Sequence, residues 1–195
     1  MAFANRYPGG TEIEISMLFV DVRGSSGLAE RMTAADFSRL MNRFYKVATD
    51  VLIRTDAIID KLVGDEVIGI YLPIFTGPDH AHPAVLAAKE LLESTGHAEE
   101  NGPWLPIGIG VHTGNVFVGT VSGAEDTVSD ITALGDNVNV TARLASLAAP
   151  GEALISESAY AAGGAHLEDL ERRVLELRGK SEPVAVRVLR VDPRS

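Results

Sequence analysis

The chain has 195 residues, which suits one ordinary domain with a single sizeable core. Seventeen basic side chains against twenty-seven acidic ones give a formal net charge of −10, so the chain lacks the basic excess that binding along nucleic-acid phosphates requires. Apolar residues make up 46% and charged residues 23%, which is typical of a globular rather than a disordered chain.

The sequence also contains no cysteine and no segment of the length that a membrane span needs. The lack of cysteine excludes disulfides, thiolate metal sites and cysteine nucleophiles, and it fits a reducing cytoplasm. Apolar stretches such as Val67–Phe75 are well below the roughly 20 residues of a spanning helix. We therefore expect a cytoplasmic protein with no membrane contact and no nucleic-acid partner.

The first predicted elements are a buried strand and a long helix. Ile13–Val22 is a nearly continuous apolar run, which predicts the strand, and the small residues of Gly24–Gly27 interrupt it. Thr33 is a suitable N-cap for a helix that continues to about Thr55, because apolar residues recur there at three- and four-residue steps.

The middle of the chain predicts a hairpin, a loop and further alternating elements. Ala57–Leu62 and Val67–Tyr71 are two short strands joined through a turn that contains Gly64 and Asp65. Pro73–Pro83 is predicted to be a solvated loop, its histidines included. The later elements expected are helices at Ala84–Ser94 and Asn137–Leu147 and strands at Ile107–Val111, Val116–Val121, Ala153–Ser156 and Val184–Val191.

This order of elements predicts an α+β, ferredoxin-like sheet of the split βαβ, palm-like type, antiparallel-rich, with helices packed on it and a C-terminal αβ extension. We expect the domain to occupy residues 13–191, between tails at 1–12 and 192–195. Right-handed crossovers place the first strand centrally, with the second strand of the hairpin antiparallel beside it. Asp21, at the end of the first strand, and Asp65, at the hairpin tip, should therefore converge in space.

Two converging carboxylates beside a Gly-Ser loop favour a divalent cation together with phosphate. Mg²⁺ takes oxygen ligands and leaves room for substrate phosphates, and backbone N–H groups of Arg23–Gly27 could hold the phosphate oxygens. The alternative is that Asp21 only caps a helix and Asp65 only serves a turn. The topology that brings the two together favours the metal site.

Three further polar residues have weaker signals when they are taken alone. Lys61 precedes the hairpin tip among apolar neighbours, although a lysine at a strand end is usually solvated. Asn139 and Arg143 are four residues apart and share one helix face, where they could hold a ribose and a charged phosphate. The alternative for this pair is an exposed polar helix face.

Several ordered segments resemble the catalytic domain of the class III nucleotidyl cyclases, the adenylate and guanylate cyclases, and the resemblance extends from about Ile15 to Val191. Four segments at suitable spacing make a specific match, and a fifth is similar to the closing segment of the family. These segments are Leu18–Gly24, Asp60–Glu66, Gly108–Gly114, Leu134–Arg143 and Leu177–Val184.

The resemblance implies a role for each matching position. Asp21 and Asp65 are similar to the metal-binding aspartates, with the Val22 carbonyl as a further ligand. Lys61 and Thr132 occupy the positions that read the purine, and Lys with Thr resembles the adenine-selective subgroup called class IIIb. The other positions implied are Asn139 and Arg143 for the ribose and the transition state, Gly24, Ser25 and Ser26 beside the phosphates, and either Arg178 or Lys180 on the triphosphate.

The resemblance also implies the reaction: conversion of ATP to 3′,5′-cyclic AMP and pyrophosphate with two divalent cations, Mg²⁺ or Mn²⁺, at composite sites shared across a homodimer. The alternatives are a guanylate cyclase and a catalytically silent cyclase-homology module that only dimerises. The Gly64-Asp65-Glu66 hairpin is also similar to that of diguanylate cyclases, but the Asn139–Arg143 segment has no counterpart there. Ser25 and Ser26 depart from the aromatic residue and threonine that are common in the family.

Overall fold

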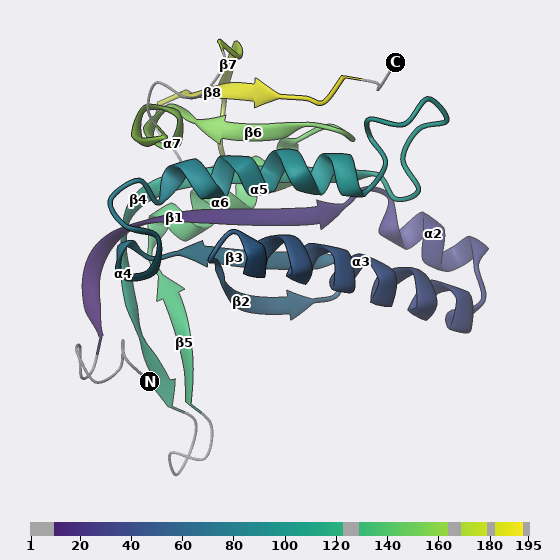
Figure 1. The fold of residues 1–195 in the computed structure, drawn as a ribbon, viewed down its shortest axis with the longest axis horizontal. Helices are drawn as coiled ribbons and strands as arrows, with labels where there is room; N and C mark the ends of the chain where they lie inside the picture. Colours follow the sequence, from purple (N-terminus) through teal and green to yellow (C-terminus); the bar gives the residue numbers. More distant parts are fainter. Residues whose placement is uncertain (1–9, 123–128, 164–168, 179–181, 193–195) are drawn as a thin grey trace.

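The computed structural model describes residues 10–122, 129–163, 169–178 and 182–192 as one mixed sheet with helices on both faces (Figure 1). The strand order is β2-β3-β1-β4-β6-β8-β7, and β5 pairs with β4 beyond this row. The strands are β1 Thr11–Val22, β2 Ile58–Val63, β3 Glu66–Tyr71, β4 Ile107–Ser122, β5 Ser129–Leu134, β6 Ala153–Ser156, β7 Glu171–Leu175 and β8 Val184–Leu189. The helices are α2 Ser25–Arg31, α3 Ala34–Arg54, α4 Pro73–Thr76, α5 Ala81–Ser94, α6 Asp136–Leu147 and α7 Glu157–Ala162.

The split βαβ arrangement predicted for the first two-thirds of the chain is confirmed. β1 lies at the centre, antiparallel to both β3 and β4. Because side chains alternate along a strand, Leu18 and Val20 pack into one core, while Met17 and Phe19 pack into a second core on the opposite face. β6 runs parallel to β4, and β8 and β7 extend the sheet as the expected C-terminal part.

The helices cover the two faces of the sheet. The hydroxyl of Thr33 accepts the Asp36 N–H at 3.1 Å, so the predicted cap of α3 is confirmed, and α3 ends at Arg54. α3 and α5 pack on the face that holds Leu18 and Val20, and α6 packs on the other face, against β4 and β1 (Figure 1).

β4 differs from its prediction. The sequence predicts two strands with a break near Gly114, whereas β4 is a single strand of 16 residues. Gly114 stays extended and pairs with Ile15, and its missing side chain leaves space for Asn137: an added Cβ would lie 2.6 Å from Asn137 Nδ2. Gly114 therefore allows Asn137 to pack against β4, and it does not form a turn. β5, which the sequence analysis did not predict, pairs with the second half of β4.

The predicted loop at Pro73–Pro83 is also only partly correct. Pro73–Thr76 forms the short helix α4, and α5 begins at Ala81, three residues before its predicted start. His80 is not solvated. Only 4% of it is exposed, and its Nδ1 lies 2.9 Å from the hydroxyl of the buried Ser16. Burial lowers the pKa of His80, which favours the neutral ring.

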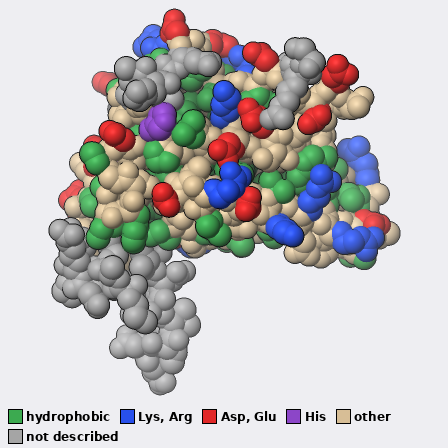
Figure 2. Space-filling view, viewed as in Figure 1, with side chains coloured by type: hydrophobic (Ala, Val, Ile, Leu, Met, Phe, Trp, Pro, Cys, Tyr) green, Lys and Arg blue, Asp and Glu red, His purple; other side chains and the backbone are tan. Residues whose placement is uncertain are grey.

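The surface over α3 and α5 carries acidic and basic side chains in alternation rather than one basic patch (Figure 2). Two of these charges lie at the end of α3, where Arg54 pairs with Asp50 at 3.2 Å and with Glu90 at 2.9 Å. Among the described residues, no helix combines the length and apolar character that crossing a bilayer demands.

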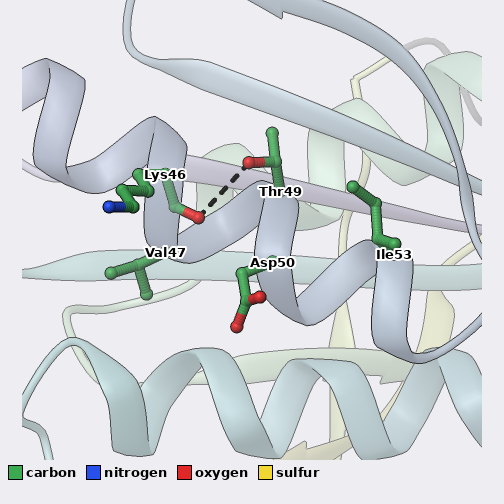
Figure 3. A pocket seen from close by; sticks show the side chains of 5 residues that line it. All are labelled: Lys46, Val47, Thr49, Asp50 and Ile53. Carbon is green, nitrogen blue, oxygen red and sulfur yellow. Dashed lines mark hydrogen bonds between the residues drawn. The ribbon is translucent and has the colours of Figure 1, made fainter.

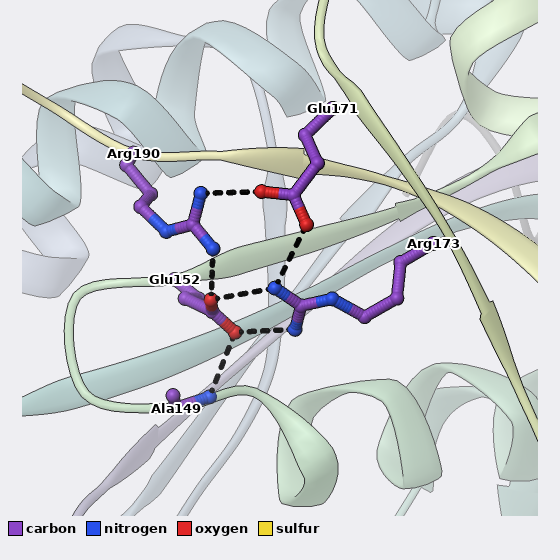
Figure 4. Close-up of polar contacts among 5 residues, drawn as sticks. All are labelled: Ala149, Glu152, Glu171, Arg173 and Arg190. Atoms are coloured by element: carbon purple, nitrogen blue, oxygen red, sulfur yellow. Dashed lines mark hydrogen bonds and ion pairs between the residues drawn. The ribbon is translucent and has the colours of Figure 1, made fainter.

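An ion-pair cluster around the buried Glu152 attaches the last strands to the loop before β6 (Figure 4). Glu152 is 6% exposed and accepts two hydrogen bonds from Arg173, at 2.9 and 3.0 Å, and one from Arg190 at 2.6 Å. The same carboxylate accepts the Ala149 N–H at 3.2 Å, and Glu171 bridges the two arginines from the other side. β7 is an edge strand whose charges are paired in this way, which explains why its sequence resembles a charged tail.

We expect this cluster to make stability depend on pH. Hydrogen bonds from Arg173, opposed by burial, lower the pKa of Glu152 from 4.5 to about 2. The stabilisation is therefore complete above pH 4.5 and is lost as the pH falls toward 2, by on the order of 2–3 kcal/mol. Thermal unfolding measured from pH 6 to pH 2.5 should show a smaller decline in Glu152→Gln than in the wild type. Glu100→Gln, at an exposed turn, is the control, and an equally steep decline in Glu152→Gln would contradict the assignment.

Candidate active site

Asp21 and Asp65 meet at one edge of the sheet, as the topology predicts. Asp21 is the last residue of β1 that pairs with β3, and its partner there is Glu66, directly after Asp65. The backbone N–H of Val22 donates to the Asp65 carbonyl at 3.0 Å, which joins the end of β1 to the hairpin tip. Two residues that are distant in the sequence are thus held together by backbone pairing.

The hairpin tip is held by two side chains. Gly64 has φ of +62°, a conformation that favours glycine, and the Tyr45 hydroxyl of α3 donates a hydrogen bond to its carbonyl. The Ser25 hydroxyl, at the start of α2, donates to Asp65 Oδ2. The serine that replaces the common aromatic residue therefore contacts the candidate metal ligand directly.

Negative charge accumulates at this edge. Burial raises the pKa of Asp21; Arg23 opposes the shift, and Asp65 adds to it. Burial also raises the pKa of Glu66, to which Asp21 and Asp65 contribute by repulsion. A cation placed here would relieve the mutual repulsion of the carboxylates, because it favours their charged forms.

The donor set fits a divalent cation that is shared with a substrate. Asp21 and Asp65 supply carboxylate oxygens, and Mg²⁺ commonly takes one or two carboxylates together with water and substrate phosphates. Within the described ranges no group of three or more His, Asp or Glu side chains is arranged around a common point as in a complete protein cage. The site therefore suits an ion that arrives with a polyphosphate.

A pocket of about 320 Å³ adjoins this edge. The side chains at its rim come from α2, α3 and the hairpin, so Ser25, Ser26 and Asp65 face the same space. The described lining residues are Ser25, Ser26, Ala29, Phe37, Gly64 and Asp65. The predicted residues Gly24 and Ser26 lie beside the carboxylates, although α2 is too short for its N-terminus to be a strong anion site.

α6 is positioned by three glycines and one histidine on β4. Gly108, Gly110, His112 and Gly114 alternate along one face of that strand, and α6 lies across them. An added Cβ at Gly110 would lie 2.5 Å from the Thr141 carbonyl, so glycine permits the close approach. His112, the one residue of the four with a side chain, forms a hydrogen bond through Nε2 with Asn137 Oδ1 at 2.9 Å, at the start of α6.

Asn139 and Arg143 both lie on α6. Asn139 is exposed, and Arg143 is half-buried. Nη1 of Arg143 is buried and has no hydrogen-bond partner among the described residues. Because a buried donor without a partner is costly, this atom is suited to a group that a substrate or a second chain would supply.

The remaining predicted residues that the structure describes lie on other parts of the fold. Lys61 on β2 is 48% exposed and lies 4.0 Å from the carboxylate of Asp60. Thr132 lies on β5, opposite Gly119 of β4. Arg178 is exposed after β7, and Lys180 falls outside the described residues, so the choice between them stays a prediction.

A larger hollow of about 510 Å³ follows α3 but contains no comparable chemistry (Figure 3). Thr49 bonds back to the Lys46 carbonyl at 3.3 Å, and Asp50 is paired with Arg54, so the hydroxyl and the carboxylate of this hollow already have partners within the helix. It is lined by Lys46, Val47, Thr49, Asp50 and Ile53.

Sequence reasoning missed two residues of the carboxylate edge, Arg23 and Glu66. Arg23 Nη2 lies 2.8 Å from Asp21 Oδ2. Glu66 could have been found, because the hairpin register places it opposite Asp21. Arg23 gives no such signal, because its partner on α6 is 123 residues away in the chain.

The fold and this edge define a class: a palm-like α+β domain with one carboxylate at the end of its central strand and one at a hairpin tip, beside a pocket. The comparisons specify the family. The model of the adenylate and guanylate cyclase catalytic domain matches residues 10–189, and the chain belongs to this family.

Several relatives are similar over most of the chain. The uncharacterized protein Rv1318c of Mycobacterium tuberculosis is 30% identical over 180 residues, which cover 90% of this chain but 32% of that protein. The chain thus spans about a third of the curated relatives it matches.

Two solved structures share the fold closely. The adenylyl cyclase CyaB from P. aeruginosa is 27% identical with a TM-score of 0.78, over 95% of this chain and 97% of that chain. The guanylyl cyclase Cya2 is 26% identical with a TM-score of 0.79, over 92% and 93%. Both nucleotide specificities therefore occur among the structures that this chain resembles.

Proposed function

We propose that this domain is an adenylate cyclase that converts ATP to 3′,5′-cyclic AMP and pyrophosphate, at two sites shared across a homodimer. The observation that carries the proposal is the separation of the polar residues. Asp65 lines a pocket together with residues of α2 and α3, whereas Asn139 and Arg143 lie on α6, which packs on the opposite face of the sheet. A second copy of the chain would bring the missing set to each pocket, because a two-fold dimer uses the same surfaces twice.

In the proposed reaction the ribose 3′-oxygen of ATP attacks the α-phosphorus, the bond to the pyrophosphate oxygen breaks, and the 3′-hydroxyl proton leaves to solvent. Arg143 neutralises the charge that grows on the α-phosphate, which is worth several kcal/mol where water is excluded. Asn139 orients the ribose. The N–H groups around Gly24 and Ser25, together with Arg178 or Lys180, hold the phosphates.

Two divalent cations, Mg²⁺ or Mn²⁺, would supply activation of the hydroxyl and stabilisation of the leaving group. Asp21, Asp65 and the Val22 carbonyl would hold them. The Ser25 hydroxyl holds the carboxylate of Asp65 in place, and Tyr45 holds the hairpin tip that carries it.

Selectivity for adenine is assigned to Lys61 and Thr132. The chain is about equally similar to the structures of an adenylyl cyclase and a guanylyl cyclase, so the fold does not distinguish ATP from GTP. The proposal of adenine selectivity therefore depends on Lys61 and Thr132. A lysine can donate to an acceptor nitrogen of adenine, whereas a glutamate at this position would accept from the guanine N–H groups.

Product analysis tests the proposal. With ATP, GTP and either Mg²⁺ or Mn²⁺, we expect cyclic AMP to be formed at least about tenfold faster than cyclic GMP, the discrimination that one well-placed polar contact supplies. Lys61→Glu should weaken the preference for ATP, because it replaces a positive charge beside the purine with a negative one. Chromatography of the products gives both rates.

Lys46→Glu is the matched control and should keep the wild-type preference, because Lys46 is also exposed but lies on α3. Cyclic GMP as the main product of the wild type would favour the guanylate cyclase alternative. No product from either nucleotide, in a protein shown to be dimeric, would favour a silent dimerisation module.

A further inference from the structure

Arg23 connects the carboxylate edge to the end of α6. Its Nη2 atom lies 2.8 Å from Asp21 Oδ2, and its Nη1 atom donates to the Ser146 carbonyl at 2.9 Å. The backbone N–H of Arg23 donates to the Pro106 carbonyl at 2.8 Å. The side chain is 17% exposed, so its position is set by these contacts rather than by solvent.

The contact with Asp21 places a positive charge where a metal ion would bind. Asp21 Oδ2 is one of the few carboxylate oxygens at this edge, and the side chain is 27% exposed, which leaves it open to an incoming ion. The Nη2 atom lies at ion-pair distance but forms no aligned hydrogen bond. The guanidinium also donates through Nε to the Asp21 backbone carbonyl at 3.4 Å, so the two residues share an ion pair and one long hydrogen bond. A divalent cation carries twice the charge of a guanidinium and can replace it at the carboxylate.

The contact with Ser146 is of another kind. Ser146 is in the last turn of α6, where carbonyl groups lack partners within the helix and carry the negative end of the helix dipole. A guanidinium is a suitable partner there, whether or not it also contacts Asp21. Arg23 therefore has a second anchor if it is displaced from the carboxylate.

We propose that Arg23 is an internal counter-ion of Asp21 that a divalent cation displaces, and that it remains attached to α6 through Ser146 when this happens. The inference rests on the proposed function, because it takes Asp21 as a metal ligand. Arg23 acts through Asp21 and is thus a positioning residue. It balances the carboxylate before the ion arrives and weakens binding of an ion that comes without a nucleotide.

Binding of Mn²⁺ to the nucleotide-free protein, measured from the electron paramagnetic resonance signal of the free ion, tests this inference. Arg23→Gln removes the charge and keeps an amide donor on a shorter side chain. We expect its Mn²⁺ affinity to rise about three- to tenfold, the range expected when a partly buried charge is removed beside the site. Arg54→Gln, which removes one positive charge at the end of α3, should leave the affinity within about twofold of the wild type.

Unchanged or weaker Mn²⁺ binding by Arg23→Gln would overturn the counter-ion role. Asp21→Asn separates this failure from that of the proposed function. If Asp21→Asn leaves Mn²⁺ affinity unchanged, the metal role of Asp21 is itself wrong; if it weakens binding while Arg23→Gln has no effect, only the inference about Arg23 fails.

A second measurement uses the wild-type chain, so its result does not require that any variant folds correctly. The Nε–H resonance of Arg23, assigned by nuclear magnetic resonance, should shift as Mg²⁺ saturates the site, because the guanidinium leaves Asp21. A resonance that stays unchanged at saturating Mg²⁺ would overturn the proposal.

Discussion

Asp21→Ala and Arg143→Ala should each lose at least about a hundredfold of the cyclase activity, and an equal mixture of the two should regain about a quarter of the wild-type activity. Each variant alone lacks one essential group in both shared sites. In the mixed dimer both defects fall in one site, and the other site is intact. The rate of cyclic AMP formation after mixing gives the result.

The control for this experiment pairs Asp21→Ala with Asp65→Ala. Both residues lie on the same carboxylate edge, so a dimer of these two variants has a defect in each site and should not recover. Heterodimer formation is verified by co-purification with two different tags. If the heterodimers form and Asp21→Ala with Arg143→Ala stays inactive, the shared-site model is wrong.

Gly110→Ala should destabilise the domain by about 3 kcal/mol or more, which corresponds to a fall in the unfolding temperature of roughly 6–12 °C. The added Cβ would lie 2.4 Å from the Ala145 nitrogen and 2.5 Å from the Thr141 carbonyl, both in the backbone of α6. Because a helix backbone cannot yield like a side chain, α6 must move away from β4. Activity should fall as well, since α6 carries Asn139 and Arg143.

The matched stability control is Gly27→Ala, on the short helix α2. The nearest described atom to its added Cβ is the end of the Arg31 side chain at 3.3 Å, and alanine favours a helix, so this variant should be as stable as the wild type or slightly more stable. Circular dichroism melting compares the two. Equal stability of Gly110→Ala and the wild type would contradict the close approach of α6.

The centre of the fold was predictable because its signals are local. The apolar run that ends at Asp21, the cap at Thr33 and the Gly64-Asp65 turn each determine an element within a few residues. Topology then brings Asp21 and Asp65 together without any knowledge of side-chain contacts. This part of the candidate site follows from strand order alone.

The rest depends on contacts that no local pattern encodes. Gly114 resembles a turn residue in the sequence, but β4 continues through it. The glycine is needed there because Asn137 occupies the space that a Cβ would take. Arg23 has its partners in β1 and at the far end of α6. Edge strand β7 escaped prediction because its arginines are paired with residues far away in the chain, Arg173 with Glu152 and Arg172 with Glu157.

The central position of β1 has a consequence for the synthesis of the chain. β1 is made before β4, and one of its two edges stays open until β4 emerges, because residues Thr11 to Val22 pair with Val118 back to Ile107. During that interval a nascent chain carries an apolar strand with an unpaired edge. Long-range pairing of this kind slows folding and exposes the intermediate to association. A cell that makes this domain must protect its first strand until the second half of the chain has arrived.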